Sequence, residues 1–233
     1  MAERLDQVLD RLDSLVAHLG DMADELTLVG GCLTPLLITD PAAPAPRATL
    51  DIDMIVEVAT HSAYHRLNQR MMAQGFHLGS DPDDPICRFR KADLVVDLMP
   101  TDARVLGFGS IWYAQAAATA ATITLPSGRQ LRHATAPLFL ATKIEAFRSR
   151  GKGDYLESRD FEDIVALVDG RSELAGELAA APGELRDWVR AEVGAMMGDR
   201  GFTDSLYGMF PGPGDVAGRV VLVRARFDAL ASG

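Results

Sequence analysis

Apolar positions along the chain change from short strings in the first part to helical stripes in the second. Short apolar strings predict strands at residues 26–29, 49–56, 76–78, 86–89, 94–99, 122–125 and 129–131, and helical periodicity predicts helices at 5–19 and 62–74. From residue 136 onward, apolar residues recur with the helical period almost throughout. The pattern predicts an α+β fold, with a mixed sheet and flanking helices over residues 1–135 and a C-terminal helical region over 136–233.

One segment interrupts the helical stripes of the second part. Residues 201–214 hold three aromatic side chains and two prolines. This composition predicts a structured loop or a lid.

Composition narrows the class of protein. No apolar stretch of the 233 residues reaches the ~18 needed for a membrane span, so we expect a cytoplasmic protein without a membrane partner. The two cysteines, Cys32 and Cys87, are far apart and lack metal-ligand spacing, which predicts buried free thiols. A net charge of −10 argues against broad non-specific binding to nucleic acid.

The most informative polar residues are Asp51 and Asp53, a D-x-D pair inside an apolar string. Alternate side chains on a strand share a face, so both carboxylates point the same way, with backbones about 6–7 Å apart. A solvated strand end accounts for such a pair as well as a metal site does. Asp97 favours the metal site, because an unpaired charge within Leu-Val-Val-Asp-Leu-Met is costly. A neighbouring strand that brings Asp97 beside the pair would complete a three-carboxylate site for Mg²⁺.

Gly30 and Gly31 directly follow the apolar string 26–29. Their backbone N–H groups would allow close approach of a phosphate, although most Gly-Gly pairs simply form turns. Neither a Walker loop nor a dinucleotide-binding fingerprint is present. The order is the informative part: strand, glycine pair, helix, strand with D-x-D, and a later strand with Asp97.

This order resembles the nucleotidyltransferase superfold typified by DNA polymerase β. The string Arg47-Ala48-Thr49-Leu50-Asp51-Ile52-Asp53 is similar to the R-x-T-x-D-I-D string of the AbiEii/AbiGii toxin-like nucleotidyltransferases. Residues 143–150 and 158–164 are similar to the K-x-x-A…R and [KR]-D-x-x-D segments of that family. The resemblance spans residues 26–170.

The resemblance implies transfer of a nucleoside monophosphate from an NTP to a hydroxyl, with release of pyrophosphate. Asp51 and Asp53 would hold two Mg²⁺ ions, and Asp97 would complete the shell beside the attacking hydroxyl. Gly30 and Gly31 would cradle the phosphates. The other nucleotide-binding candidates that the resemblance implies are Arg47, Thr49, Lys143, Arg148 and Asp160.

Several of these residues have alternative roles. Lys143 would stabilise charge on the departing pyrophosphate or would be a surface lysine. In the first case, its replacement by alanine should weaken NTP binding with little effect on stability. Arg47 would reach the nucleotide or only fasten its loop. Asp160 and Asp163 would either orient Lys143 or Arg148, or be solvated acids at a helix N-terminus.

Two groups of basic residues interrupt the acidic composition. The first is Lys143, Arg148, Arg150, Lys152 and Arg159, and the second is Arg88, Arg90 and Lys91. For each group a solvated surface is the alternative to a binding role.

Three functions follow from these features. The first is a toxin-like nucleotidyltransferase that acts on an RNA 3′ end, with tRNA as the expected RNA, and that an antitoxin protein restrains. The second is a nucleotidyltransferase for a small acceptor such as an aminoglycoside, because an acidic protein attracts a cationic acceptor. The third is a non-catalytic nucleotide-binding protein of the same fold, against which the presence of all three acids argues.

Overall fold

The computed structural model describes residues 2–150, 153–210 and 215–232. The chain forms two compact units, a sheet unit (residues 2–35 and 48–135) and a helical unit (residues 36–47 and 136–233). The sequence predicts one division of the chain, after residue 135. The structure differs in that residues 36–47 belong with the C-terminal helices. The backbone N–H groups of Thr39 and Asp40 both donate to the carbonyl of Gly170, at 2.9 Å each, and so fix this segment to the helical unit.

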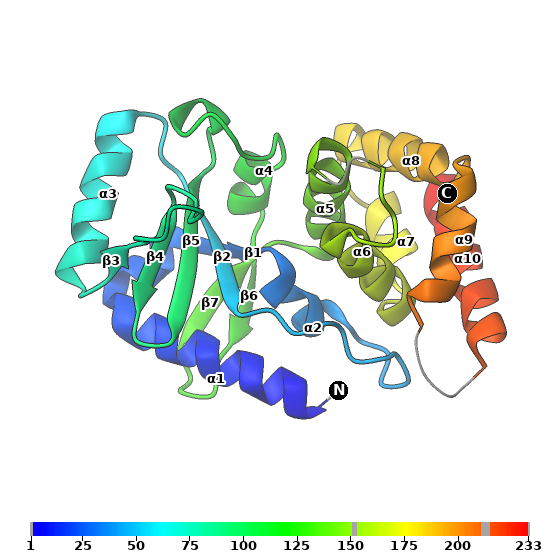
Figure 1. Ribbon diagram of the computed structural model, residues 1–233, viewed down its shortest axis with the longest axis horizontal. Helices are drawn as coiled ribbons and strands as arrows, with labels where there is room; N and C mark the ends of the chain where they lie inside the picture. Colours follow the sequence, from blue (N-terminus) through cyan, green and yellow to red (C-terminus); the bar gives the residue numbers. More distant parts are fainter. Residues whose placement is uncertain (1, 151–152, 211–214, 233) are drawn as a thin grey trace. The chain divides into compact units, whose positions relative to one another are not determined.

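The sheet unit contains a seven-stranded mixed sheet. Its strands are β1 (Leu26–Val29), β2 (Asp51–Val56), β3 (His77–Leu78), β4 (Arg88–Lys91), β5 (Leu94–Pro100), β6 (Ala121–Thr124) and β7 (Gln130–His133). They lie in the order β3-β4-β5-β2-β1-β7-β6 (Figure 1). β2 is parallel to β5 and β1 is parallel to β7, whereas the other neighbours are antiparallel. The predicted α+β class is confirmed.

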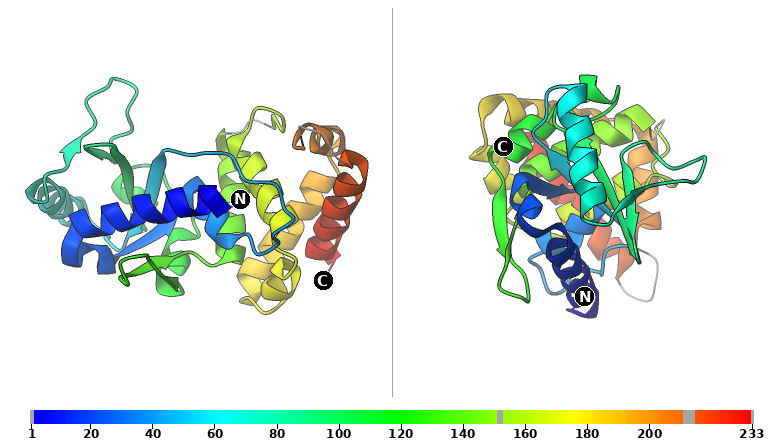
Figure 2. Two further views of the ribbon diagram at one scale, coloured as in Figure 1. Left: turned by 90° about the horizontal axis from the view of Figure 1, so that it is seen from below. Right: turned by 90° about the vertical axis from the view of Figure 1, so that its left-hand side faces the viewer.

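Short and long helices accompany the sheet. They are α1 (Ala2–Leu19), α2 (Thr34–Leu37), α3 (His61–Ala73) and α4 (Tyr113–Ala118). The alanine-rich α4 is absent from the sequence prediction, because it lacks an apolar stripe. The helix that the predicted order places after the glycine pair is a 3₁₀ turn (Gly31–Leu33) followed by the four residues of α2. Figure 2 shows the connection between β3 and β4 projecting away from the sheet.

The helical unit consists of α5 (Ala136–Arg150), α6 (Arg159–Gly170), α7 (Leu174–Ala179), α8 (Gly183–Met197), α9 (Arg200–Gly208) and α10 (Val216–Ser232), together with residues 36–47. Aromatic rings fill its core. Tyr155 and Phe161 stack edge to face with centroids 4.8 Å apart, and Phe202 packs against Phe227 at 5.0 Å. Such pairs add to the apolar burial that holds the helices together.

The predicted loop or lid over residues 201–214 is wrong for its first part. Asp199 caps α9 by accepting a hydrogen bond from the N–H of Gly201, and Phe202 and Leu206 are buried. The prediction failed because Phe202 belongs to the helical core, whereas Tyr207 is exposed on the same helix. Residues 211–214, like Lys152, lie outside the described residues.

The remaining class-level expectations concern thiols and membranes. Cys32 and Cys87 are free and buried, as predicted, and burial raises the pKa of each thiol to about 12. Within the described ranges, no helix has the length and apolar character required to cross a bilayer.

Candidate functional site

The three predicted aspartates lie on one face of two adjacent parallel strands. Asp53 of β2 is the register partner of Asp97 of β5, and Asp51 lies two residues earlier on β2. Register partners on neighbouring strands point to the same side, as do residues i and i+2. The intervening Ile52 and the following Met54 are fully buried on the opposite face. The apolar alternation of β2 therefore fixes the direction of both carboxylates.

An arginine from the next strand lies among these acids. Arg88 of β4 is the register partner of Asp97 on the other side of β5. Its Nε and Nη2 donate to the two oxygens of Asp97, at 2.8 and 2.7 Å, and Nη2 also donates to Asp51 at 3.0 Å. Hydrogen bonding to Asp97 raises the pKa of Arg88, so its guanidinium is charged at every accessible pH. The second basic group is thus not simply a solvated surface.

The predicted three-carboxylate metal site is only partly present. The carboxylate oxygens are the hard donors that Mg²⁺ prefers, and their strands place them side by side. The described part of the chain nevertheless contains no cluster of three His, Cys, Asp or Glu side chains drawn together to hold an ion. A physical reason is that Arg88 supplies the positive charge that Asp51 and Asp97 would otherwise need. The three carboxylates are chemically suited to a divalent cation, but Arg88 has to move away before one ion can bind Asp51 and Asp97.

The backbone of Gly30 lies against the side chain of Asp53. Gly30 has φ +69° and ψ −174°, a conformation that side chains rarely adopt. A Cβ atom built on Gly30 would lie 1.9 Å from Oδ2 and 2.6 Å from Cβ of Asp53. The backbone directly after β1 therefore packs against the Asp53 side chain. The predicted glycine pair and the predicted D-x-D pair are neighbours in space.

We expect Gly30→Ala to cost more stability than backbone strain alone explains. An alanine in this extended region of positive φ costs about 1–3 kcal/mol, and overpacking against Asp53 should add about 1–3 kcal/mol. Gly128→Ala is the matched control, because Gly128 has φ +85° and nothing within 4 Å of the added Cβ. Urea unfolding measures both variants. Equal losses would mean that Asp53 does not lie against Gly30.

Arg11 is a residue that sequence analysis missed. It lies on α1, and its guanidinium donates to the carbonyl of Thr49 at 3.3 Å and to that of Leu50 at 2.6 Å. These two residues immediately precede Asp51, so α1 fixes the start of the aspartate-bearing strand. Thr49 and Leu50 lie 38 and 39 residues after Arg11 in the sequence, so no local pattern predicts these contacts. Thr49 is held here through its backbone.

In the helical unit, Lys143 is buried between two acids. Its Nζ on α5 lies 3.1 Å from Asp160 and 2.6 Å from Asp163, both on α6 and both buried. The alternatives of a surface lysine and of solvated acids are therefore wrong. Arg150 completes the cluster by donating to Asp160 at 2.8 and 3.1 Å. The charge of the Lys143 ammonium is therefore balanced by acids of its own unit, and its predicted contact with the departing pyrophosphate stays a prediction.

The pKa of Asp160 reflects these competing surroundings. Burial acts to raise it, but the hydrogen bond from Arg150 and the charge of Lys143 lower it by more. The net pKa lies below the ordinary value, so Asp160 is ionised at neutral pH.

The two remaining arginine candidates also have acidic partners. Arg47 makes a bidentate pair with Asp163, at 3.2 and 3.1 Å, which fastens residues 36–47 to α6. This contact agrees with the alternative in which Arg47 fastens its own loop. Arg148 pairs with Glu192 of α8 rather than with Asp160 or Asp163.

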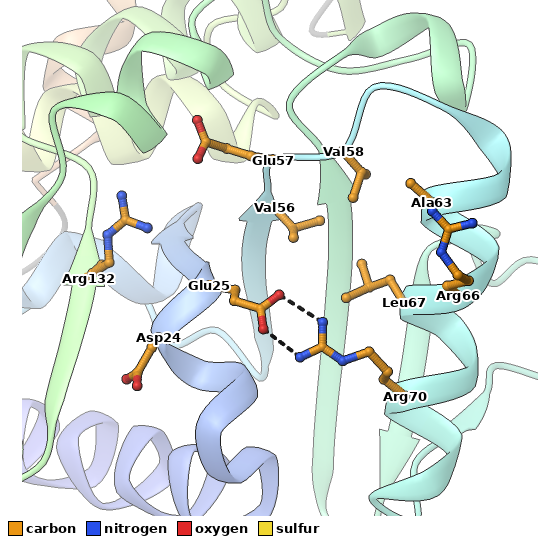
Figure 3. A pocket seen from close by; sticks show the side chains of 10 residues that line it. All are labelled: Asp24, Glu25, Val56, Glu57, Val58, Ala63, Arg66, Leu67, Arg70 and Arg132. Atoms are coloured by element: carbon orange, nitrogen blue, oxygen red, sulfur yellow. Dashed lines mark hydrogen bonds and ion pairs between the residues drawn. The ribbon is translucent and has the colours of Figure 1, made fainter.

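A pocket of about 570 Å³ opens at the other end of β2 from the aspartates (Figure 3). Its lining comprises Asp24, Glu25, Val56, Glu57, Val58, Ala63, Arg66, Leu67, Arg70 and Arg132. Three acids and three arginines line it, so no net charge selects a ligand. Arg70 and Glu25 neutralise each other, at 2.8 and 2.5 Å. The candidate site is therefore the aspartate face rather than this pocket.

Comparisons with known proteins add little. The chain matches no protein-family model and no curated protein. It is similar to the crystal structure of JHP933 from Helicobacter pylori, with a TM-score of 0.47 and 14% identity, over 97% of this chain and 92% of that chain. A likeness at this level implies no shared activity, so the function has to be inferred from the residues of this chain.

Proposed function

We propose that the protein is a metal-dependent nucleotidyltransferase that moves a nucleoside monophosphate from an NTP to a hydroxyl acceptor. One observation carries the proposal. Asp51, Asp53 and Asp97 share a face of two parallel strands, with Asp53 directly opposite Asp97. The contact between Gly30 and Asp53 supports it, because it puts backbone suited to phosphate binding beside the acids.

The proposal assigns tasks to the three aspartates and to the glycine pair. Asp51, Asp53 and Asp97 would hold two Mg²⁺ ions, which when bound would neutralise the triphosphate and acidify the attacking hydroxyl. The acceptor oxygen forms a bond to the α-phosphorus as the bond to the pyrophosphate oxygen breaks. A carboxylate oxygen of Asp97 takes the hydroxyl proton. The N–H groups of Gly30 and Gly31 hold the phosphates.

The acceptor belongs to the same proposal. The resemblance to toxin-like enzymes favours an RNA 3′ end, with tRNA as the RNA, a cytoplasmic setting and an antitoxin protein as partner. The net charge of −10 favours a cationic small acceptor such as an aminoglycoside. These are the two candidates that one assay has to separate.

Label transfer tests the proposal. The protein is incubated with Mg²⁺ and each NTP labelled in its α-phosphate, with total tRNA in one series and an aminoglycoside panel in the other. We expect label in one acceptor series, with release of pyrophosphate, and loss of both signals when EDTA is added. Label in neither series with any NTP would reject the enzymatic function.

A further inference from the structure

Arg88 occupies the space that a cation between two of the aspartates would need. A single atom of its guanidinium, Nη2, lies 2.7 Å from Oδ2 of Asp97 and 3.0 Å from Oδ2 of Asp51. Nε adds the second half of a bidentate pair with Asp97. One positive group thus joins the carboxylates of two strands, as a bridging metal ion would.

The register of the sheet fixes the backbone position of Arg88. β4 and β5 pair antiparallel with Arg88 opposite Asp97, and β5 pairs with β2 with Asp97 opposite Asp53. The three side chains form a row across the same face. Arg88 and Asp97 are largely enclosed, with 17% and 11% of their side chains exposed, so their attraction is little screened by solvent.

A third carboxylate, beyond Asp51 and Asp97, offers Arg88 another partner. Nη1 of Arg88 lies 3.4 Å from Asp84, which belongs to the connection between β3 and β4. Asp84 is itself held by Arg90 at 2.8 Å. The guanidinium can therefore leave Asp51 and Asp97 without losing every acidic neighbour.

We propose that Arg88 is a tethered cation that takes the metal's place in the metal-free protein and must leave before one ion binds Asp51 and Asp97 together. It keeps the like charges of the two strands together until that exchange. Arg88 is thus a positioning residue that weakens metal binding by the free protein. The inference rests on the metal site of the proposed function, but not on the reaction or the acceptor.

Manganese binding tests this inference without any measurement of activity. Metal-free protein is titrated with Mn²⁺, and free Mn²⁺ is followed by electron paramagnetic resonance. We expect Arg88→Gln to bind Mn²⁺ at least about tenfold more tightly than the parent, because a charge-assisted pair no longer has to break. Arg104→Gln is the control: it removes the same charge from the sheet unit at a side chain that is 89% exposed and that pairs with Asp102, so it leaves the contacts of Arg88 to Asp51, Asp97 and Asp84. Its affinity should stay within about twofold of the parent.

Thermal unfolding gives a second readout. Without metal, Arg88→Gln should melt below Arg104→Gln, because Asp51 and Asp97 then lose the guanidinium that pairs with both. Mn²⁺ should raise the melting temperature of Arg88→Gln more than that of the control. Should Arg88→Gln not fold, Arg88→Lys, which keeps the charge but loses the bidentate pair, should bind Mn²⁺ more tightly than the parent.

The outcomes separate this inference from the proposed function. Equal Mn²⁺ affinities in the parent, the Arg88 variants and Arg104→Gln would overturn the role of Arg88 while leaving a metal site. Absence of Mn²⁺ binding in every variant would overturn both. Tighter binding by Arg88→Gln that an added Asp51→Asn substitution abolishes, in a protein that transfers no nucleotide, would uphold Arg88 and reject the enzyme.

Discussion

Replacing Lys143 with alanine is expected to lower the free energy of unfolding by roughly 3 kcal/mol. The substitution removes the ammonium that Asp160 and Asp163 share, in a place where all three side chains are buried. Loss of one partner of a buried ion pair costs about 3–5 kcal/mol, and we expect the low end because each acid retains an arginine, Arg150 or Arg47. Urea unfolding measures the loss. This expectation replaces the small effect on stability that the sequence suggests.

Two further variants define the cause of that loss. Arg159→Ala removes a charge from an exposed side chain at the first residue of α6, and it should stay within about 0.5 kcal/mol of the parent. Lys143→Met keeps the length of the side chain and should still destabilise, because the acids lose their counter-charge. A Lys143→Ala variant as stable as Arg159→Ala would show that Lys143 is not buried between the acids.

Asp53→Asn is expected to reduce nucleotide transfer at least about 1,000-fold while leaving the fold intact. The change is nearly isosteric, but it removes a negative charge and a metal donor beside Gly30. Removing one of three like charges should leave the metal-free melting temperature unchanged or slightly raised. The label-transfer assay and a melting curve measure the two effects.

Asp93→Asn is the control for this substitution. Asp93 is exposed in the turn between β4 and β5, so its loss of charge leaves the aspartate face intact. Transfer should remain within about twofold of the parent. A strongly destabilised Asp53→Asn protein would instead assign Asp53 a structural task.

Much of the sheet unit could be predicted from short-range patterns. The string around Asp51 and Asp53 alternates buried and partly exposed residues, which defines both a strand and its polar face. The hairpin at residues 121–133 follows from its turn residues. Placement of Asp97 beside Asp53 follows only if the two strands are neighbours, which the resemblance supplied and periodicity does not.

The contacts of Arg88 escaped prediction because their signal is weak. β4 and β5 are joined by the two-residue turn Ala92-Asp93, and the pairing of Lys91 with Leu94 sets Arg88 opposite Asp97. Ala92 adopts φ 51°, a conformation for which asparagine and glycine are the usual signals. Without such a residue, the turn and hence the register could not be inferred.

Burial of the charged cluster around Lys143 was hidden for a different reason. A lysine and two aspartates within helices normally indicate a solvated surface. Their burial depends on the packing of α5 against α6, and on Arg47 arriving from a segment 116 residues earlier. Neither helix reveals this partner in its own sequence.

The return of residues 36–47 to the helical unit has a consequence for synthesis of the protein. Arg47 leaves the ribosome 116 residues before Asp163, and Thr39 leaves it 131 residues before Gly170. At about 5–20 residues per second, the segment waits on the order of ten seconds for its partners. A nascent chain that stalls before Gly170 therefore carries an unpaired segment between two stretches of the sheet unit. Neither unit corresponds to one uninterrupted fragment of the chain.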